Sequence, residues 1–265
     1  MTAGVRNWRT ALSGAVCAVV VLAGGTLSGC GGPPAEPEEE ETNGLDSLPA
    51  ATIEERALDA ALGAEAVHLS GRGVITDGDG FRLDMRLGPD GGIGEVSIQG
   101  MTFELLRVGE DLFLKADGAF WQHQWEDGDE EAEAGIDPSG TLGGKYVKVA
   151  PDDPAYETLS GFTDKNTMIH LLLTMEGERS VGERGEVGET ETISVLAGEG
   201  AGGVLDVALV GDPYPLRFAR AGEAGQLSLA DWDKEFTLRA PQEDQILDYG
   251  DEMILPSEGT GTEEG

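Results

Sequence analysis

A short segment of this chain, residues 81–87, alternates strictly between apolar and charged side chains. Because successive side chains of a β-strand point to opposite faces, Phe81, Leu83, Met85 and Leu87 share one face and the charged residues share the other. One apolar and one charged face are typical of an antiparallel sheet that is buried on a single side. The chain must therefore supply neighbouring strands and an apolar layer that covers the inner face.

Turn signals and further apolar runs predict the neighbouring strands. A D-G-D-G turn at residues 77–80 precedes the alternating segment, and a glycine-rich stretch at residues 88–92 follows it. This series of strands favours antiparallel pairing between successive segments. Strands are predicted at residues 68–75, 81–87, 94–98, 102–108, 111–116, 189–196, 204–210, 216–221, 226–230 and 235–238.

Two segments have the apolar spacing of amphipathic helices. Thr52-Ile53-Glu54-Glu55 matches the S/T-x-x-E capping box, so a helix is predicted from residue 52 to about residue 65. A second helix is predicted within residues 159–176, where Met168 and Leu172 are among the residues at helical spacing. Two helices among so many strands indicate an α+β fold, a large twisted antiparallel sheet whose concave face the helices cover.

The N-terminus has the layout of a cleaved export signal. Arg6 and Arg9 precede an apolar run at residues 11–23, which is too short to span a bilayer comfortably. The motif Leu27-Ser28-Gly29-Cys30 resembles the lipobox of bacterial lipoproteins, in which small residues precede a cysteine that receives a diacylglycerol. We therefore predict cleavage between Gly29 and Cys30, with acyl chains such as palmitate attached at Cys30. Because the two arginines are not adjacent, we expect export by the general secretory route and anchoring at the outer face of the cell membrane.

The chain is strongly acidic, with 51 Asp and Glu against 17 Lys and Arg and a formal net charge of −34. A surface this acidic repels phosphate backbones, so nucleic acid is not an expected partner. Residues 30–51 include several prolines and the run Glu38-Glu39-Glu40-Glu41, and we predict that they form a disordered tether behind the lipidated cysteine. Residues 251–265 are predicted to be an acidic disordered tail, which leaves residues 52–250 as the folded domain.

No motif in the sequence supplies a catalytic or metal site. Residues 198–203 satisfy G-x-G-x-x-G, but a predicted strand follows where a nucleotide-binding loop needs a helix, so a hairpin turn is the better interpretation. The turn at residues 77–80 lacks the later ligands of a calcium loop. His68, His123 and His170 are far apart, and neither a serine nucleophile motif nor a phosphate loop occurs. We therefore expect no enzyme activity, no cofactor and no metal.

An aromatic cluster just before the acidic stretch at residues 126–133 allows two interpretations. Phe120, Trp121, His123 and Trp125 either cap the end of a strand as packed side chains or form the rim of a ligand opening. The second interpretation rests on the preference of rings with a polar edge for half-exposed positions.

Several segments, taken in order, resemble the LppX/LprAFG family of actinobacterial lipoproteins. They are residues 64–71, 81–87, 91–94, 103–115, 121, 144–149, 212–218 and 229–241, all behind the lipobox. The resemblance extends from about residue 52 to residue 248 and implies a fold similar to the LolA and LolB lipoprotein carriers. It implies a half-open β-barrel with helices on the concave side, an apolar cavity between them, and a role in binding or moving acylated lipids and glycolipids.

We therefore expect a membrane-anchored extracytoplasmic lipoprotein that binds or carries a hydrophobic ligand, a lipid or glycolipid, as a monomer. The alternative is a non-carrier lipoprotein, an interaction or sensing module at the cell surface, whose interior is filled by its own side chains. The two differ in whether a cavity lies between the sheet and the helices. The expected cavity-lining residues are Phe81, Leu83, Met85, Leu87, Phe103, Leu105, Met168 and Leu172.

Overall fold

The computed structural model describes residues 42–74, 80–118, 120–121, 144–220 and 224–247. Its α-helices are α1 (Ala50–Gly63), α4 (Pro154–Gly161) and α5 (Lys165–Leu172). Short 3-10 turns are η1 (Leu45–Ser47), η3 (Gly198–Gly200) and η5 (Glu243–Gln245). The strands are β1 (Val67–Val74), β2 (Gly80–Gly88), β3 (Gly91–Ile98), β4 (Met101–Val108), β5 (Asp111–Ala116), β6 (Tyr146–Val149), β7 (Arg179–Val187), β8 (Thr190–Ala197), β9 (Gly203–Ala208), β10 (Pro215–Arg220), β11 (Gly225–Ala230) and β12 (Ile246–Leu247).

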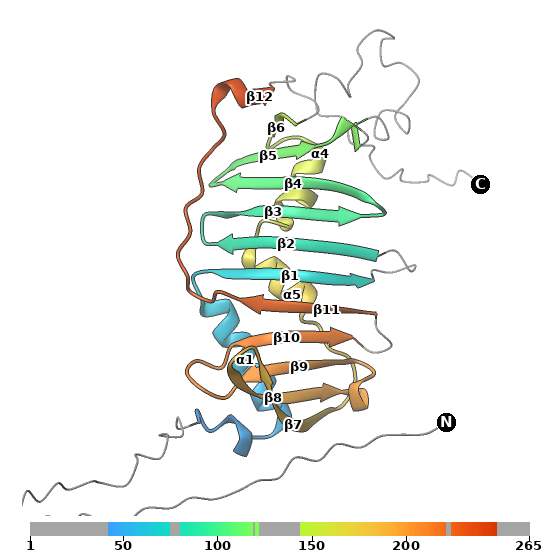
Figure 1. The fold of residues 1–265 in the computed structure, drawn as a ribbon, viewed down its shortest axis with the longest axis vertical. Helices are drawn as coiled ribbons and strands as arrows, with labels where there is room; N and C mark the ends of the chain where they lie inside the picture. Colours follow the sequence, from blue (N-terminus) through green and yellow to red (C-terminus); the bar gives the residue numbers. More distant parts are fainter. Residues whose placement is uncertain (1–41, 75–79, 119, 122–143, 221–223, 248–265) are drawn as a thin grey trace, which may run out of the picture. The chain divides into compact units, whose positions relative to one another are not determined.

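The described residues form one 12-stranded sheet, in the order β12-β6-β5-β4-β3-β2-β1-β11-β10-β9-β8-β7. Every neighbouring pair is antiparallel except β12 and β6, which are parallel. Figure 1 shows the strands stacked in this order in an open, twisted sheet that does not close into a barrel. The predicted α+β class with a large antiparallel sheet is therefore confirmed.

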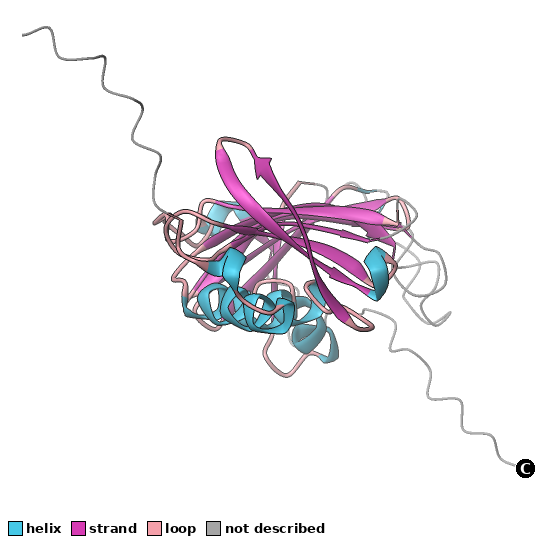
Figure 2. Cartoon of the chain, turned by 90° about the horizontal axis from the view of Figure 1, so that it is seen from below, coloured by secondary structure: helices cyan, strands magenta, loops and turns pink. Residues whose placement is uncertain are grey.

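The helices lie on one face of the sheet, as Figure 2 shows. α1 packs against β7, β8, β9 and β10 and against α5. The sheet face and the helices enclose one hydrophobic core, because an apolar sheet face and apolar helix stripes are both removed from water there. Its largest fully buried side chains are Phe218, Leu45, Ile53, Leu69, Met85, Leu87, Leu105, Leu112, Leu114, Met168 and Ile169.

The folded domain begins earlier than the sequence predicted. Leu45 is only 1% exposed, and the backbone N–H of Asn43 donates a hydrogen bond to the carbonyl oxygen of Leu209. α1 opens directly behind Pro49, so Thr52 lies inside its first turn and the predicted capping box is not the helix start. The boundary between residues 51 and 52 is therefore corrected, because apolar residues before it join the core. Residues 30–41 of the predicted tether lie outside the described residues.

The single helix predicted within residues 159–176 is interrupted. α4 ends at Gly161 and α5 begins at Lys165. Asp164 lies between them, and its carboxylate accepts a hydrogen bond from the backbone N–H of Thr167 at 2.8 Å, which caps α5. A capping residue has non-helical backbone torsions, so one continuous helix cannot pass through Asp164.

The strand predicted at residues 235–238 does not form. After β11 the chain turns through Asp231 and Asp233, both with positive φ, and then runs extended along the ends of the strands to η5 and β12 (Figure 1). Trp232 stacks on Tyr214 with ring centroids 4.8 Å apart, and Asp233 accepts a hydrogen bond from the backbone N–H of Glu65 at 2.6 Å. These side-chain contacts hold the segment in place of strand pairing.

Candidate ligand cavity

A cavity of about 310 Å³ lies between the middle of the sheet and α5. Its lining comes from five adjacent strands, β10, β11, β1, β2 and β3, from α5 and from Phe162 just before α5. Most of these residues are apolar, and the described lining includes no acidic side chain. The cavity is thus an apolar space with a continuous strand floor and a helical roof.

Two rows of inner-face residues form the floor, and each residue in a row lies opposite the next in the strand ladder. The outer row is Arg220, Gly225, Gly73, Phe81 and Ile98. The inner row is Phe218, Leu227, Gly71, Leu83 and Val96, and all of these except Gly71 line the cavity. The roof over these rows is made by Met168, Leu171 and Leu172 of α5.

Two facing glycines lie in the outer row. Gly73 and Gly225 lie opposite each other on β1 and β11, in the middle of this row. The ring of Phe81 lies over Gly73, where an added Cβ would come within 2.5 Å of the ring carbon Cε1. At Gly225 the backbone φ is 143°, a value that other residues rarely adopt. At Gly225 an added Cβ would come within 2.4 Å of the carbonyl oxygen of Arg72, so glycine at these two facing positions lets the Phe81 ring and the β1 backbone approach closely beside the cavity.

The solvent exposure of the floor residues differs between the two rows and shows where the cavity opens. Phe218 and Leu83 in the inner row are buried, whereas Arg220 in the outer row is exposed. On the roof, Leu171 is 61% exposed. The mouth therefore lies at the outer row. The guanidinium carbon of Arg220 is 5.8 Å from the ring centroid of Phe218, at the boundary between the apolar interior and solvent.

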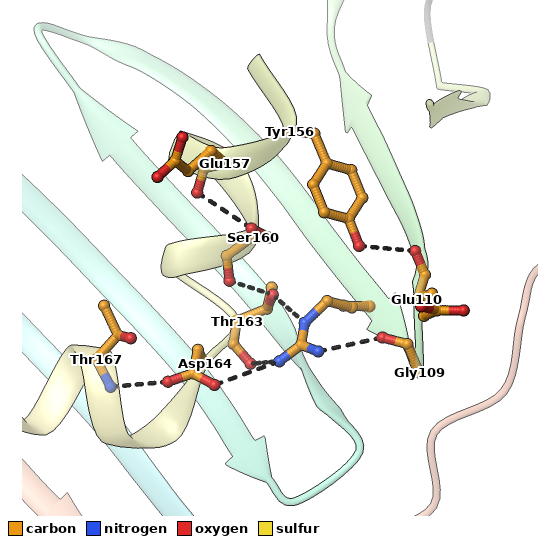
Figure 3. A network of polar contacts seen from close by, with 9 residues as sticks. Gly109, Glu110, Tyr156, Glu157, Ser160, Thr163, Asp164 and Thr167 are labelled. Carbon is orange, nitrogen blue, oxygen red and sulfur yellow. Dashed lines mark hydrogen bonds and ion pairs between the residues drawn. The ribbon is translucent and has the colours of Figure 1, made fainter. Parts of the chain in front are cut away.

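The connection between α4 and α5 is held to the sheet by Arg107 of β4, in the network shown in Figure 3. Nε of Arg107 donates to Oγ1 of Thr163 at 2.8 Å, and its two Nη atoms donate to the carbonyl oxygens of Thr163 and Gly109, both at 3.1 Å. Burial alone would raise the pKa of Asp164, but the hydrogen bonds from Thr167 and the charge of Arg107 outweigh it and hold this pKa below its ordinary value. The network fixes the segment that contributes Phe162 to the cavity.

Lys165 fixes the start of α5 to the end of α1. Its side chain is buried, and Nζ donates hydrogen bonds to the carbonyl oxygens of Ala61 and Leu62, both at 2.9 Å. These carbonyls belong to the last turn of α1, which has no main-chain partners for them. Burial lowers the pKa of Lys165, against the attraction of Asp164 and Asp233. The roof of the cavity is thereby tied both to the sheet and to α1.

The structure divides the predicted lining residues into two groups. Phe81, Leu83, Met168 and Leu172 line the cavity. The other four, Met85, Leu87, Phe103 and Leu105, are buried in the core and do not line it. That a ligand contacts any of them stays a prediction.

Sequence reasoning missed the lining residues of β10 and β11. Phe218, Arg220, Gly225 and Leu227 join the cavity because β11 pairs with β1, a contact between segments far apart in the chain that alternation does not reveal. One signal was available in the sequence. Glycines at alternate positions of β1, one of them Gly73, mark places where another group approaches the strand closely, which at Gly73 is the ring of Phe81.

The aromatic cluster is packed where the structure describes it. Phe120 and Trp121 are buried, and the ring centroid of Phe120 is 5.5 Å from that of Phe103 and 5.1 Å from that of Trp121. Neither residue lines the cavity. The interpretation as a packed strand end holds for these two, while His123 and Trp125 lie outside the described residues.

Other candidate sites resolve into ordinary structure. Among the described residues, no group of three or more His, Cys, Asp or Glu side chains is placed to hold a metal ion. His68 contacts Asp84 at 2.8 Å, and residues 198–203 form a turn between β8 and β9, as predicted. Within the described ranges, no helix combines the length and the apolar character needed to cross a membrane. The export signal, Gly29, Cys30 and the turn at residues 77–79 lie outside them.

Comparison with known proteins gives matches to solved structures, whereas no family model and no curated protein matches the chain. LprF from Mycobacterium bovis matches with 14% identity and a TM-score of 0.48, over 72% of this chain and 96% of LprF. The lipoprotein LppX from Mycobacterium tuberculosis matches with 14% identity and a TM-score of 0.43, over 72% of this chain and 98% of LppX. The MucA/MucB complex of Pseudomonas aeruginosa matches with 13% identity and a TM-score of 0.28, over 74% of this chain and 59% of the matched chain. LprF and LppX are lipoproteins of the family that the sequence resembles.

Proposed function

We propose that this chain is a cell-envelope lipoprotein that binds a hydrocarbon chain of a lipid or glycolipid in the cavity between the sheet and α5. The observation that carries the proposal is the cavity itself, which is apolar, open at one end and about 310 Å³ in volume. Ligand sites range from roughly 300 to 1,000 Å³, so this one is at the small end. At about 30 Å³ per non-hydrogen atom, the share of one water in the liquid, it holds about ten such atoms. The space therefore suits one short acyl chain.

The energetics favour reversible binding. Removing a methylene from water contributes about 0.8 kcal/mol, so a ten-carbon chain gains about 8 kcal/mol in this lining. The loss of translational and rotational freedom on association costs at least about 4 kcal/mol. The remainder of at most about 4 kcal/mol corresponds to a dissociation constant of about 1 mM. Binding of this strength is suited to a carrier that must load and release its ligand.

The proposal includes the setting predicted from the N-terminus. The chain is exported by the general secretory route, is anchored through Cys30 at the outer face of the cell membrane and acts as a monomer. A binding role is proposed in preference to catalysis, because the described lining offers no Ser, Cys, His, Lys or carboxylate side chain as a nucleophile or a general acid or base.

A chain-length series tests the proposal. The mature chain with Cys30→Ala, which lacks the acyl groups of the anchor, is titrated with hexanol, octanol, decanol and dodecanol in a calorimeter. Affinity should rise roughly fourfold per methylene up to about ten carbons and then level off. Ile98→Trp fills the outer row and should abolish binding, whereas Val181→Trp on β7, outside the cavity, should leave it unchanged. An affinity independent of chain length, or an equal loss in both variants, would refute the proposal.

The alternative, a non-carrier interaction or sensing lipoprotein, is favoured by the rest of the interior. Met85, Leu105, Leu112 and Leu114 are fully buried, so the sheet is covered by the protein's own side chains outside the cavity. Mass spectrometry of organic extracts distinguishes the two roles, with the protein purified from an actinobacterial host. A lipid that is present with the unmodified chain and absent with Ile98→Trp supports the carrier. Repeated recovery of lipid-free protein supports the alternative.

A further inference from the structure

The mouth of the cavity carries a positive charge that the described structure does not neutralise. Arg220 is exposed at the end of the outer row and has no ion pair among the described residues. Arg107, Arg179 and Arg217 each lie within ion-pair distance of a carboxylate. Other described arginines, Arg82 and Arg86 among them, also lack an ion pair with a described residue, but Arg220 lies on the inner face and lines the cavity, where the described lining offers no carboxylate.

The register shows that this charge faces the cavity. Arg220 lies two residues after Phe218, so both side chains are on the inner face. Its partner across the ladder is Gly225, which has no side chain to occupy the space beside it. The planar guanidinium presents paired N–H donors that match a carboxylate or a phosphate. The mouth therefore places a guanidinium beside an apolar space.

The net charge of the protein makes this arrangement selective. A formal charge of −34 repels free anions from the domain as a whole. An anion is held at Arg220 only when burial of an attached apolar tail offsets that repulsion. Small inorganic anions lack such a tail, and neutral lipids gain nothing from the guanidinium.

We propose that the ligand of this cavity is a single-chain amphiphile with an anionic headgroup, a carboxylate or a phosphate, bound by Arg220 while its tail occupies the cavity. This inference rests on the proposed function and adds the chemical class of the headgroup to it.

The test compares three ten-carbon probes, decanol, decanoate and decyl phosphate, on the mature chain with Cys30→Ala. Arg220→Gln should weaken binding of one or both anionic probes about fivefold more than it weakens binding of decanol, the change expected for an exposed charge pair. Arg82→Gln is the matched control, because Arg82 is exposed on the opposite face of the same sheet and its loss changes the net charge equally. It should leave all three affinities unchanged. A larger loss for decyl phosphate assigns a phosphate headgroup, and a larger loss for decanoate assigns a carboxylate.

The outcomes separate the inference from the proposed function. If decanol binds but Arg220→Gln weakens neither anionic probe more than it weakens decanol, or if Arg82→Gln weakens the anionic probes equally, the headgroup assignment is overturned and the apolar cavity site stands. If decanol also fails to bind, the proposed function is overturned and the headgroup assignment with it. Decanol binding by Arg220→Gln also shows that this variant is folded.

Discussion

Replacing Arg107 with methionine tests whether one side chain holds the α4–α5 connection to the sheet. Arg107 is 16% exposed and donates two hydrogen bonds to Thr163 and one to the carbonyl oxygen of Gly109. Methionine keeps much of the aliphatic stem in place, so the substitution removes the donors without opening a large void. The change therefore isolates the polar network of Figure 3 from the packing around it.

The expected loss follows from the burial of the acceptors. A hydrogen bond from a charged donor contributes about 1.5–3 kcal/mol, and a buried carbonyl left without a partner costs about 1–3 kcal/mol. Thr163 is 0% exposed, so water does not take the place of the guanidinium at its carbonyl oxygen. Because the bonds share one donor group, their contributions are not additive. We expect the free energy of unfolding to fall by about 3 kcal/mol, a large share of the roughly 5–15 kcal/mol typical of a domain.

Urea unfolding followed by tryptophan fluorescence measures this loss. The midpoint should fall while the slope stays constant, because the variant exposes the same surface on unfolding. Arg86→Met is the matched control: Arg86 is exposed on the outer face of β2, and its loss should change stability by less than about 0.5 kcal/mol. A loss for Arg107→Met below about 1 kcal/mol, or one equal to that of Arg86→Met, would show that the network does not hold the connection.

Three further predictions concern lipidation and pH. Cys30→Ala should abolish incorporation of radiolabelled palmitate, because it removes the predicted acceptor thiol, whereas Cys17→Ala should not. Label retained by Cys30→Ala would contradict lipidation at Cys30. The pKa of Asp164 is lowered on folding, so the ionised carboxylate stabilises the folded state above its ordinary pKa of about 3.9, and this contribution is lost as the pH falls through the pKa in the folded state. Between about pH 6 and about pH 3, Asp164→Asn should therefore lose less unfolding free energy than the parent chain. Equal losses in the two proteins would contradict this. The hydrogen bond to the Asp233 carboxylate raises the pKa of Tyr214 to about 12, so stability should fall as the pH rises from about 10 to about 12, and Tyr214→Phe should reduce that fall when urea midpoints are compared.

Side-chain alternation predicts the centre of this sheet and fails at its edges. β2 buries Leu83, Met85 and Leu87 and exposes the charged residues between them, because one face meets the core and the other meets water. β7 has no such signal, since it is an edge strand with mostly exposed side chains, charged residues among them. Charged side chains on an edge strand discourage pairing with other chains. The same charged side chains remove the apolar periodicity by which a strand is predicted from sequence. β6 and β12 are too short to show a period.

The cavity could be predicted only in part, because alternation identifies a face and not a position along it. Leu83 and Met85 share the inner face, yet Leu83 lies in the inner row of the cavity floor and Met85 lies one row further from the mouth, in filled core. The difference depends on which residues lie opposite in neighbouring strands. The facing pair of Gly73 and Gly225 arises from a long-range strand pairing, which no local pattern encodes.

The acidic surface and Arg220 at the mouth have opposite effects on an anionic ligand, and the dependence of the two rate constants on salt distinguishes these effects. Raising the ionic strength screens the repulsion by the net charge of −34, so association of decanoate should become faster. The same screening weakens the contact with Arg220, so dissociation should also become faster. Both rate constants should therefore rise with salt in stopped-flow measurements, while the affinity changes less than either. Decanol, which has no charge, should show neither effect, and Arg220→Gln should retain the faster association but lose the salt dependence of dissociation. Salt-independent dissociation of decanoate from the parent chain would contradict a headgroup contact at Arg220.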